Sequence, residues 1–288
     1  MPIHHIVLSG GGPAGFSLYG AIKESVKSGI LNPADIQSIW ATSAGSMIGA
    51  MICITTDWDI LDDYIIRRPW DKVCNVNLYT LMNAYMGCGL FNISVVEKIL
   101  SPLLLSKDYD ANITLQELYD KTGVDFHTFA TEINKNICVD ISHETHPTWR
   151  LVDAVYASSA LPGFFSPMFK DDCSYIDGGF YCNYPLHPCI EKYSDVDMIL
   201  GIVKHITAGV ETTLTPESTL LDLICKISFI LFNMAVEKQN QTCIKIPNEI
   251  TLDHIVMTVE TIKQCLSDEA TRCELIETGI IACRERNL

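Results

Sequence analysis

The stretch Ala41-Thr42-Ser43-Ala44-Gly45 decides how this sequence is interpreted. It follows a short apolar and β-branched run and precedes the almost wholly apolar run 46–54, so we predict a strand, a sharp turn and a buried helix. A serine at such a turn adopts a strained backbone and needs small neighbours two residues away on each side. Ala41 and Gly45 meet that need, and Ser43 is therefore a candidate nucleophile. The pattern is short and arises often by chance, so other parts of the chain must support it.

A glycine-rich loop directly follows the opening strand that we predict over residues 3–9. Gly10, Gly11 and Gly12 have no side chains, so an oxyanion can approach their backbone N–H groups closely. The helix predicted over residues 16–27 places its positive N-terminus behind the loop, and Gly15 completes the motif. We therefore predict that these glycines form an oxyanion hole, in which one donor is worth about 3 kcal/mol of barrier.

The same loop offers an alternative, because Gly10, Gly12 and Gly15 have the spacing of a dinucleotide-binding motif. That motif requires an acidic residue at the end of the second strand, where it binds the ribose. Asp35 lies at the start of that strand instead. Dinucleotide binding is therefore the weaker hypothesis.

The third feature is Asp177-Gly178-Gly179, at the expected end of a later strand. The two glycines expose backbone N–H groups that can hydrogen-bond the carboxylate and fix its direction. An isolated Asp-Gly-Gly is more often an ordinary turn. Whether Asp177 is a functional carboxylate or part of an ordinary turn therefore depends on the other motifs of the chain.

Taken together, these features resemble the patatin-like phospholipase family of lipid acyl hydrolases. The glycine loop, the turn at Ser43, the block 157–165 and the Asp177 motif occur in the family's order, and the resemblance spans residues 3 to about 205. It implies a serine and aspartate dyad, in which Asp177 accepts the proton of Ser43 and the serine attacks a carboxylic ester. It also implies that Gly10 to Gly12 stabilise the tetrahedral intermediate and that Gly178 and Gly179 support the motif. Because an ordinary aspartate is a weak base, the pocket must be dry enough to raise its pKa.

The chain departs from the family pattern at two positions. Ala14 stands where the family commonly has a basic residue, and Ala41 stands where it commonly has glycine. These departures support a second hypothesis, a lipid-binding or regulatory protein that keeps the fold and has little or no catalysis. A third hypothesis uses a histidine base. His187, His205 and His254 follow Asp177, but a serine after only the second strand does not fit the order of α/β-hydrolases.

Composition excludes several classes of function. The net charge of -15 argues against nucleic acid as a partner, and membrane contact must then be apolar or local. Twelve cysteines without a C-x-x-C pair indicate free thiols in a reducing, intracellular setting, and no Cys/His cluster has metal-ligand spacing. No secretory signal or transmembrane segment is predicted, and we expect a cytoplasmic protein with peripheral membrane contact. We expect no cofactor and no metal.

The order of predicted elements indicates an α/β fold, a three-layer α/β/α sandwich with a mostly parallel sheet. We expect a catalytic domain over residues 3–205, with a helical cap at 58–105 inside it. Residues 206–288 are expected to form a helical C-terminal extension packed on the same domain, and their apolar stretch 220–236 a packed amphipathic helix. The expected partner is a lipid substrate at a membrane or micelle surface. The head group, the ester position and the oligomeric state do not follow from the sequence.

Overall fold

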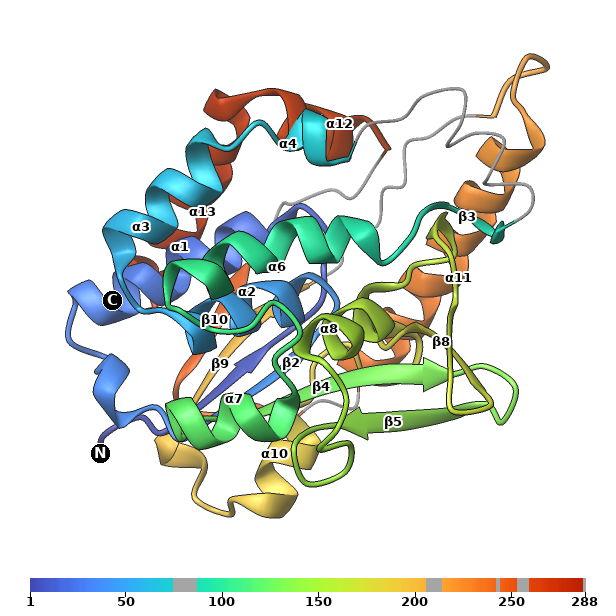
Figure 1. The fold of residues 1–288 in the computed structure, drawn as a ribbon. Coiled ribbons are helices and arrows are strands. Elements are labelled where there is room, and N and C mark those ends of the chain that lie inside the picture. Colours follow the sequence, from blue (N-terminus) through green and yellow to red (C-terminus); the bar gives the residue numbers. More distant parts are fainter. Residues whose placement is uncertain (75–86, 206–213, 242–243, 253–258, 287–288) are drawn as a thin grey trace.

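A mostly parallel sheet organises the molecule. Figure 1 shows the computed structural model, which describes residues 1–74, 87–205, 214–241, 244–252 and 259–286. Within these residues the sheet has eight strands, in the spatial order β10 (Glu249–Leu252), β9 (Ile199–Lys204), β1 (His5–Leu8), β2 (Ser38–Thr42), β4 (Asp125–Glu132), β8 (Cys173–Asp177) and β7 (Met168–Lys170), with β5 (Ile137–Ile141) paired to β4 outside this order. The pairs from β10 to β4 are parallel, and those that involve β5, β7 and β8 are antiparallel.

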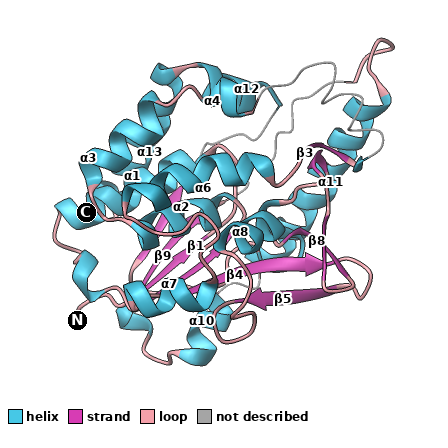
Figure 2. Cartoon of the chain, in the orientation of Figure 1, coloured by secondary structure: helices cyan, strands magenta, loops and turns pink. Residues whose placement is uncertain are grey.

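Helices cover both faces of this sheet, as Figure 2 shows by colour. Successive side chains of a strand point to opposite faces, and in β1 Ile6 and Leu8 enter the larger core while Val7 enters the smaller one. The larger core is shared by α1 (Ala14–Lys27), α2 (Ala44–Ile54), α6 (Ser94–Ser106), α8 (Leu151–Ser159) and α13 (Glu269–Glu285), and the smaller one by α10 (Leu186–Lys192). The predicted three-layer α/β fold is confirmed.

Further elements lie in the described part of the chain. They are α3 (Trp58–Asp62), a π-helical turn (Asp63–Arg67), α4 (Trp70–Val73), β3 (Gly89–Phe91), α7 (Leu115–Thr122), β6 (Gly163–Phe165), α9 (Gly179–Cys182), α11 (Leu220–Asn240), α12 (Val259–Ser267) and two 3-10 turns (Pro33–Asp35 and Val196–Met198). Strands β3 and β6 pair in parallel, away from the main sheet. The expected cap at 58–105 is therefore helical only in part, and its residues 75–86 lie outside the described part of the chain.

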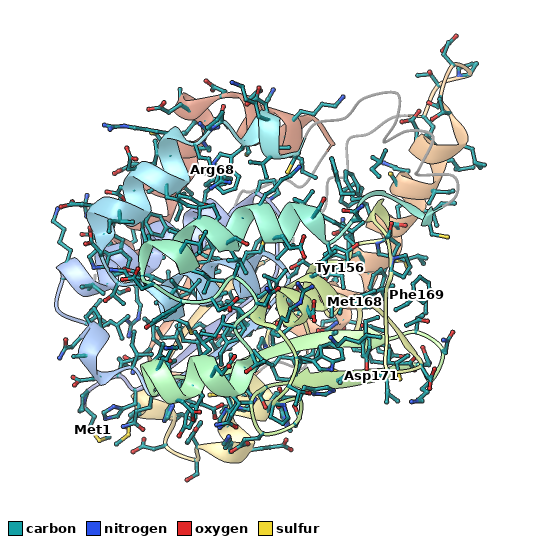
Figure 3. All side chains as sticks on the ribbon, in the orientation of Figure 1. Met1, Arg68, Tyr156, Met168, Phe169 and Asp171 are labelled. Atoms are coloured by element: carbon teal, nitrogen blue, oxygen red, sulfur yellow. The ribbon has the colours of Figure 1, made fainter. Side chains whose placement is uncertain are left out.

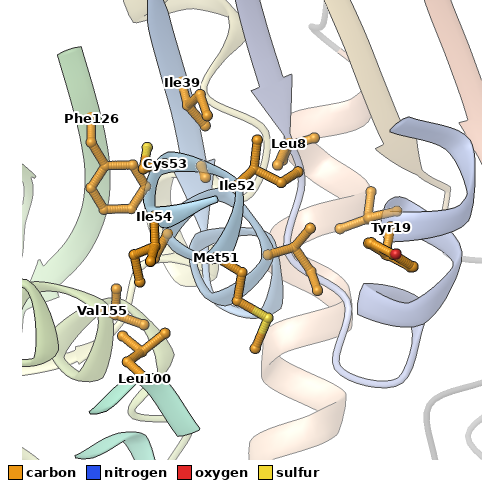
Figure 4. Close-up of a cluster of buried hydrophobic side chains, with 14 of the residues drawn as sticks. Leu8, Tyr19, Ile39, Met51, Ile52, Cys53, Ile54, Leu100, Phe126 and Val155 are labelled. Carbon is orange, nitrogen blue, oxygen red and sulfur yellow. The ribbon is translucent and has the colours of Figure 1, made fainter. Parts of the chain in front are cut away.

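Helix α2 is apolar on nearly every face and is buried accordingly. Figure 4 shows Ile52 and Ile54 among side chains from the sheet and other helices, including Leu8 of β1 and Phe126 of β4. The helix approaches β1 closely because residue 45 is a glycine, where a Cβ atom would lie 2.6 Å from the carbonyl oxygen of Ser9. Burial of this kind contributes about 1.5–3 kcal/mol for each large aliphatic side chain. The helix is thus a rigid support for the residue that precedes it.

The C-terminal segment is integrated into the fold through both a strand and a helix. Strand β10 adds to the edge of the sheet in parallel with β9, which the sequence analysis did not predict. The end of the expected helical extension is two helices, α12 and α13. They are separate because Asp268 caps the start of α13, where its carboxylate accepts hydrogen bonds from the amides of Ala270 and Thr271. In the described part of the chain, no helix combines the length and apolar character that crossing a bilayer requires.

Candidate active site

Ser43 lies at a sharp turn between the last residue of β2 and the first residue of α2. Its φ is 54° and its ψ is -123°, a combination that is strained for any residue other than glycine. The turn has the predicted geometry, with the hydroxyl on a buried helix N-terminus. Ala41 is fully buried, and its methyl group would lie 3.5 Å even from a Cβ atom placed on Gly49, which has none. The alanine is therefore accommodated without a collision.

The structure brings Ser43 and Asp177 together although they are 134 positions apart. The Ser43 hydroxyl donates a hydrogen bond of 2.6 Å to Asp177 Oδ2. Asp177 ends β8, and its other oxygen, Oδ1, accepts a hydrogen bond of 2.8 Å from the amide of Gly179. The serine is 9% exposed and the aspartate 1%. One carboxylate oxygen is thus oriented by the backbone and the other faces the hydroxyl.

The C-terminal end of α8 holds both members of this pair in place. Ser158 Oγ accepts a hydrogen bond from the amide of Ser43 at 3.0 Å, and Ser159 Oγ donates to the Ser43 carbonyl at 3.1 Å. The Asp177 amide donates to the carbonyl of Ala160 at 3.0 Å. The sequence analysis quoted this block for its resemblance but gave these serines no role. Two adjacent serines in a buried helix were the available signal, because buried hydroxyls need partners.

The glycine loop lies next to Ser43, but its three amides are not equivalent. A Cβ atom on Gly10 would lie 3.1 Å from Ser43 Cβ and 2.6 Å from Asn183 Oδ1, so a larger residue does not fit there. The Gly10 amide already donates to the carbonyl of Asn183 at 2.9 Å. This amide therefore already has an acceptor within the protein, and the role of Gly10 as an oxyanion donor stays a prediction. Among the described residues, no acceptor takes a hydrogen bond from the amides of Gly11 and Gly12.

The remaining motif glycines allow close packing around the pair. A Cβ atom on Gly178 would lie 2.0 Å from the carbonyl oxygen of Phe129, and one on Gly179 would lie 2.3 Å from the ring of Phe232 in α11. Gly15, at the start of α1, lies against Ala44. Gly178 and Gly179 are thus required by neighbouring backbone and an aromatic ring.

An apolar cavity of about 230 Å³ opens beside the pair and includes Ser43 and Asp177 in its lining. Most of its wall is aliphatic, aromatic or sulfur-containing. The side chains come from α2, α4, β3, α6, β6, α11 and α12, among them Met47, Met51, Trp70, Phe91, Val95, Phe164, Phe165, Phe232 and Ile262. Part of the expected cap thus lines the cavity.

Burial in this apolar setting raises the pKa of Asp177 to about 7, although the hydrogen bonds from Ser43 and Gly179 lower it in part. The direction follows from the loss of hydration of the charged form. A carboxylate with this pKa is a far better base near neutral pH than an ordinary aspartate. A raised pKa of Asp177 is what the proposed role of a base requires, as the sequence analysis stated.

A buried lysine lies behind the glycine loop, and the sequence analysis did not identify it. Lys204 ends β9, and its Cδ atom would lie 2.9 Å from a Cβ atom on Gly11. Burial lowers the pKa of its ammonium group to about 8. Ala14, where the family commonly has a basic residue, begins α1 directly after the loop, and its methyl group would lie 3.1 Å from the same Cβ atom on Gly11. A lysine side chain from another strand therefore packs against the loop.

Histidines do not take part in the described arrangement. His187 is on the surface and pairs with Glu191, and among the described residues no histidine hydrogen-bonds to Ser43 or Asp177. His254 lies outside the described residues.

A cluster at the opposite edge of the sheet resembles a metal site. Asp125, His127 and Glu144 place one ligand atom each within 4.8 Å of one another. Lys192 Nζ lies 2.8 Å from Asp125 Oδ2 and 2.8 Å from Glu144 Oε2. We assign no metal to this cluster, because an ammonium group of the chain itself already pairs with its carboxylates.

Comparison with known proteins finds one family and several similar chains. The sequence profile of the family described as Patatin-like phospholipase matches residues 6–190. Protein R571 of Acanthamoeba polyphaga mimivirus is 25% identical over 200 residues, which are 69% of this chain and 65% of that protein. Protein 463L of Invertebrate iridescent virus 6, named a probable lipid hydrolase, is 29% identical over 195 residues, which are 66% of this chain and 64% of that protein. The chain thus spans slightly less than two thirds of each relative.

A solved structure supports the fold alone. The crystal structure of VipD from Legionella pneumophila aligns with a TM-score of 0.52 and 15% sequence identity, and covers 97% of this chain and 67% of VipD.

Proposed function

The chain belongs to the patatin-like phospholipase family, and from this premise we propose that it hydrolyses carboxylic esters of phospholipids or related glycerolipids through a Ser43 and Asp177 dyad. The observation that carries the proposal is the 2.6 Å hydrogen bond from Ser43 Oγ to Asp177 Oδ2 at the wall of an apolar cavity. A nucleophile and a base within hydrogen-bond reach are the signature of nucleophilic catalysis.

In the first half of the proposed reaction, Ser43 Oγ attacks the ester carbonyl and its proton moves to Asp177 Oδ2. The tetrahedral oxyanion lies against the free amides of Gly11 and Gly12, and the N-terminus of α2 adds favourable dipole charge. Asp177 then gives the proton to the leaving alcohol, which leaves an acyl group on the serine. In the second half, Asp177 takes a proton from a water molecule as the water oxygen attacks the acyl carbonyl. The bond to Ser43 Oγ then breaks, Asp177 returns the proton to that oxygen, and the fatty acid is released.

Two features support this assignment of roles. The raised pKa of Asp177, about 7, suits a group that accepts and returns a proton near neutral pH. Lys204, behind Gly11, supplies positive charge close to the loop where an oxyanion develops. The apolar wall of the cavity suits an acyl chain, and this is the reason for a lipid rather than a small polar ester.

The test measures fatty-acid release from phospholipid mixed micelles, with a chelator present. Wild-type chain is compared with Ser43→Ala and Asp177→Asn, and with the control variants Ser94→Ala and Asp59→Asn at positions outside the site. We expect each dyad variant to lose at least about 10³-fold in kcat, and the controls to retain activity. A fluorophosphonate probe should label the wild-type chain and leave Ser43→Ala unlabelled.

The competing hypothesis of a non-catalytic lipid-binding protein gives a different outcome. In that case no variant, including the wild-type chain, releases fatty acid or reacts with the probe, while lipid binding is retained. Hydrolysis that survives Ser43→Ala would contradict the proposed dyad.

A further inference from the structure

Helix α11 exposes an unusually apolar face. Seven large apolar side chains of this helix are exposed, namely Leu220, Leu223, Ile224, Ile227, Ile230, Leu231 and Met234. Elsewhere on the described surface such side chains are mostly scattered, as is Phe169 of β7, labelled at the sheet edge in Figure 3. The sequence analysis expected this helix to be packed. A contiguous exposed apolar face of this kind marks an interaction surface.

The spacing of these residues places them on one side of the helix. Positions 220, 224, 227, 231 and 234 follow the i, i+3, i+4, i+7 pattern, and positions 223 and 230 widen the same stripe. The opposite side is also apolar and is buried, where Phe229 and Phe232 pack against β6 and α9. The two sides of the helix therefore differ: one packs into the protein's own core, and the other is exposed.

The buried side connects this helix to the candidate site. Phe232 lines the cavity and lies against Gly179 beside Asp177. Near the end of the helix, Gln239 Nε2 donates to the carbonyl of Gly179 at 3.0 Å, and its Oε1 accepts from the amide of Asn183 at 2.7 Å. Figure 1 shows the upper part of α11 (orange) at the periphery of the molecule. One helix thus presents an apolar face outward and forms part of the site inward.

We propose that this exposed face of α11 docks on the surface of a lipid bilayer and inserts among the acyl chains, so that the cavity wall meets the lipid. The inference rests on the proposed function, which places a lipid in that cavity. Amphipathic helices bind lipid surfaces through buried apolar area and through attraction to anionic lipids. Here the net charge of -15 opposes attraction to anionic lipids, and the exposed face of α11 supplies the apolar area that is buried on binding. The docking therefore suits a zwitterionic surface such as phosphatidylcholine.

The test uses the full chain and vesicles of ether-linked phosphatidylcholine, which contain no carboxylic ester to hydrolyse. The triple variant Ile227→Gln, Leu231→Gln, Met234→Gln keeps the charge and removes three apolar side chains that are 46%, 53% and 61% exposed. A matched control, Leu105→Gln, Ile137→Gln, Ile281→Gln, removes three scattered side chains that are 61%, 47% and 45% exposed. Vesicle flotation measures the bound fraction, and thermal unfolding checks that all three proteins are folded.

We expect the triple variant to bind vesicles at least tenfold more weakly than the wild-type chain, and the control to bind as the wild type does. Wild-type binding should be unchanged between 0.1 and 1 M NaCl, because apolar insertion is not screened by salt. Equal binding by the two triple variants would overturn the proposal. Self-association in sedimentation that the α11 variant abolishes, with vesicle binding intact, would overturn it in favour of a second copy of the chain. Since ether lipids report binding alone, failure here is separate from failure of ester hydrolysis.

Discussion

Asp177 meets two opposing requirements at a single side chain. It must be dry enough to act as a base, and it must still be ionised to accept a proton. The apolar cavity supplies the first condition, and the hydrogen bonds from Gly179 and Ser43 preserve the second, so that the pKa is raised only to about 7. The same residue without its amide partner would remain protonated to higher pH.

This balance predicts the pH dependence of hydrolysis. Asp177 acts as a base only when deprotonated, so kcat/KM should rise about tenfold per pH unit below its pKa and reach a plateau above about 7. The measurement is kcat/KM on a soluble ester between pH 5 and 9. Lys204, whose pKa is about 8, also titrates near the loop. The variant Lys204→Met removes that group, and the rise near pH 7 should persist in it. A profile that rises instead near pH 4 would contradict the raised pKa.

At the scale of elements, α2 serves both the nucleophile and the cavity. Its N-terminus follows Ser43, and its next turn presents Met47 to the cavity wall. A flexible methionine at this position lets the wall adapt to an acyl chain. The length of chain that fits should therefore depend on residue 47.

We predict that Met47→Trp shortens the preferred acyl chain. The larger ring fills part of the cavity, and each methylene kept out of an apolar site loses about 0.8 kcal/mol. Excluding two methylenes lowers kcat/KM roughly tenfold for long-chain esters, while a two-carbon acyl group is unaffected. The measurement is kcat/KM across p-nitrophenyl esters of increasing chain length, in which the short ester is the internal control. A parallel decrease for all lengths would show damage to the dyad rather than a smaller cavity.

The elements that sequence could predict are those whose signal is local. Strand β2, the turn at Ser43 and helix α2 follow one another, and small residues and an apolar run define them. What the sequence missed depends on distant partners. The Gly10 amide is occupied by the carbonyl of Asn183, which is distant along the chain, and Lys204 reaches the loop from the C-terminal end of β9. Strand β10 was missed because four residues give too little periodicity. Helix α11 was predicted, but its exposed face was not, because composition does not tell which apolar side is covered.

At the scale of the whole molecule, the first and last helices close the fold against each other. Helices α1 and α13 touch through glycines, since a Cβ atom on Gly20 would lie 2.1 Å from the carbonyl oxygen of Ile276. Because α1 begins at the glycine loop, the C-terminal helix supports the element behind the candidate oxyanion site. The C-terminal segment is thus a structural part of the same body as Ser43.

The substitution Gly279→Ala tests this contact, because the contact decides whether the free energy of unfolding rises or falls. In an exposed helix, Gly→Ala stabilises by about 1 kcal/mol through propensity alone. In α13 the new methyl group would lie 1.9 Å from the carbonyl oxygen of Ser17, so the helices must separate, and overpacking of this kind costs about 1–3 kcal/mol. We therefore expect Gly279→Ala to lower the free energy of unfolding in urea, whereas Glu277→Ala, at an exposed position two residues earlier, leaves it nearly unchanged. An increase in stability for Gly279→Ala would mean that α13 does not pack on α1, because only an undocked helix gains from the alanine without a collision.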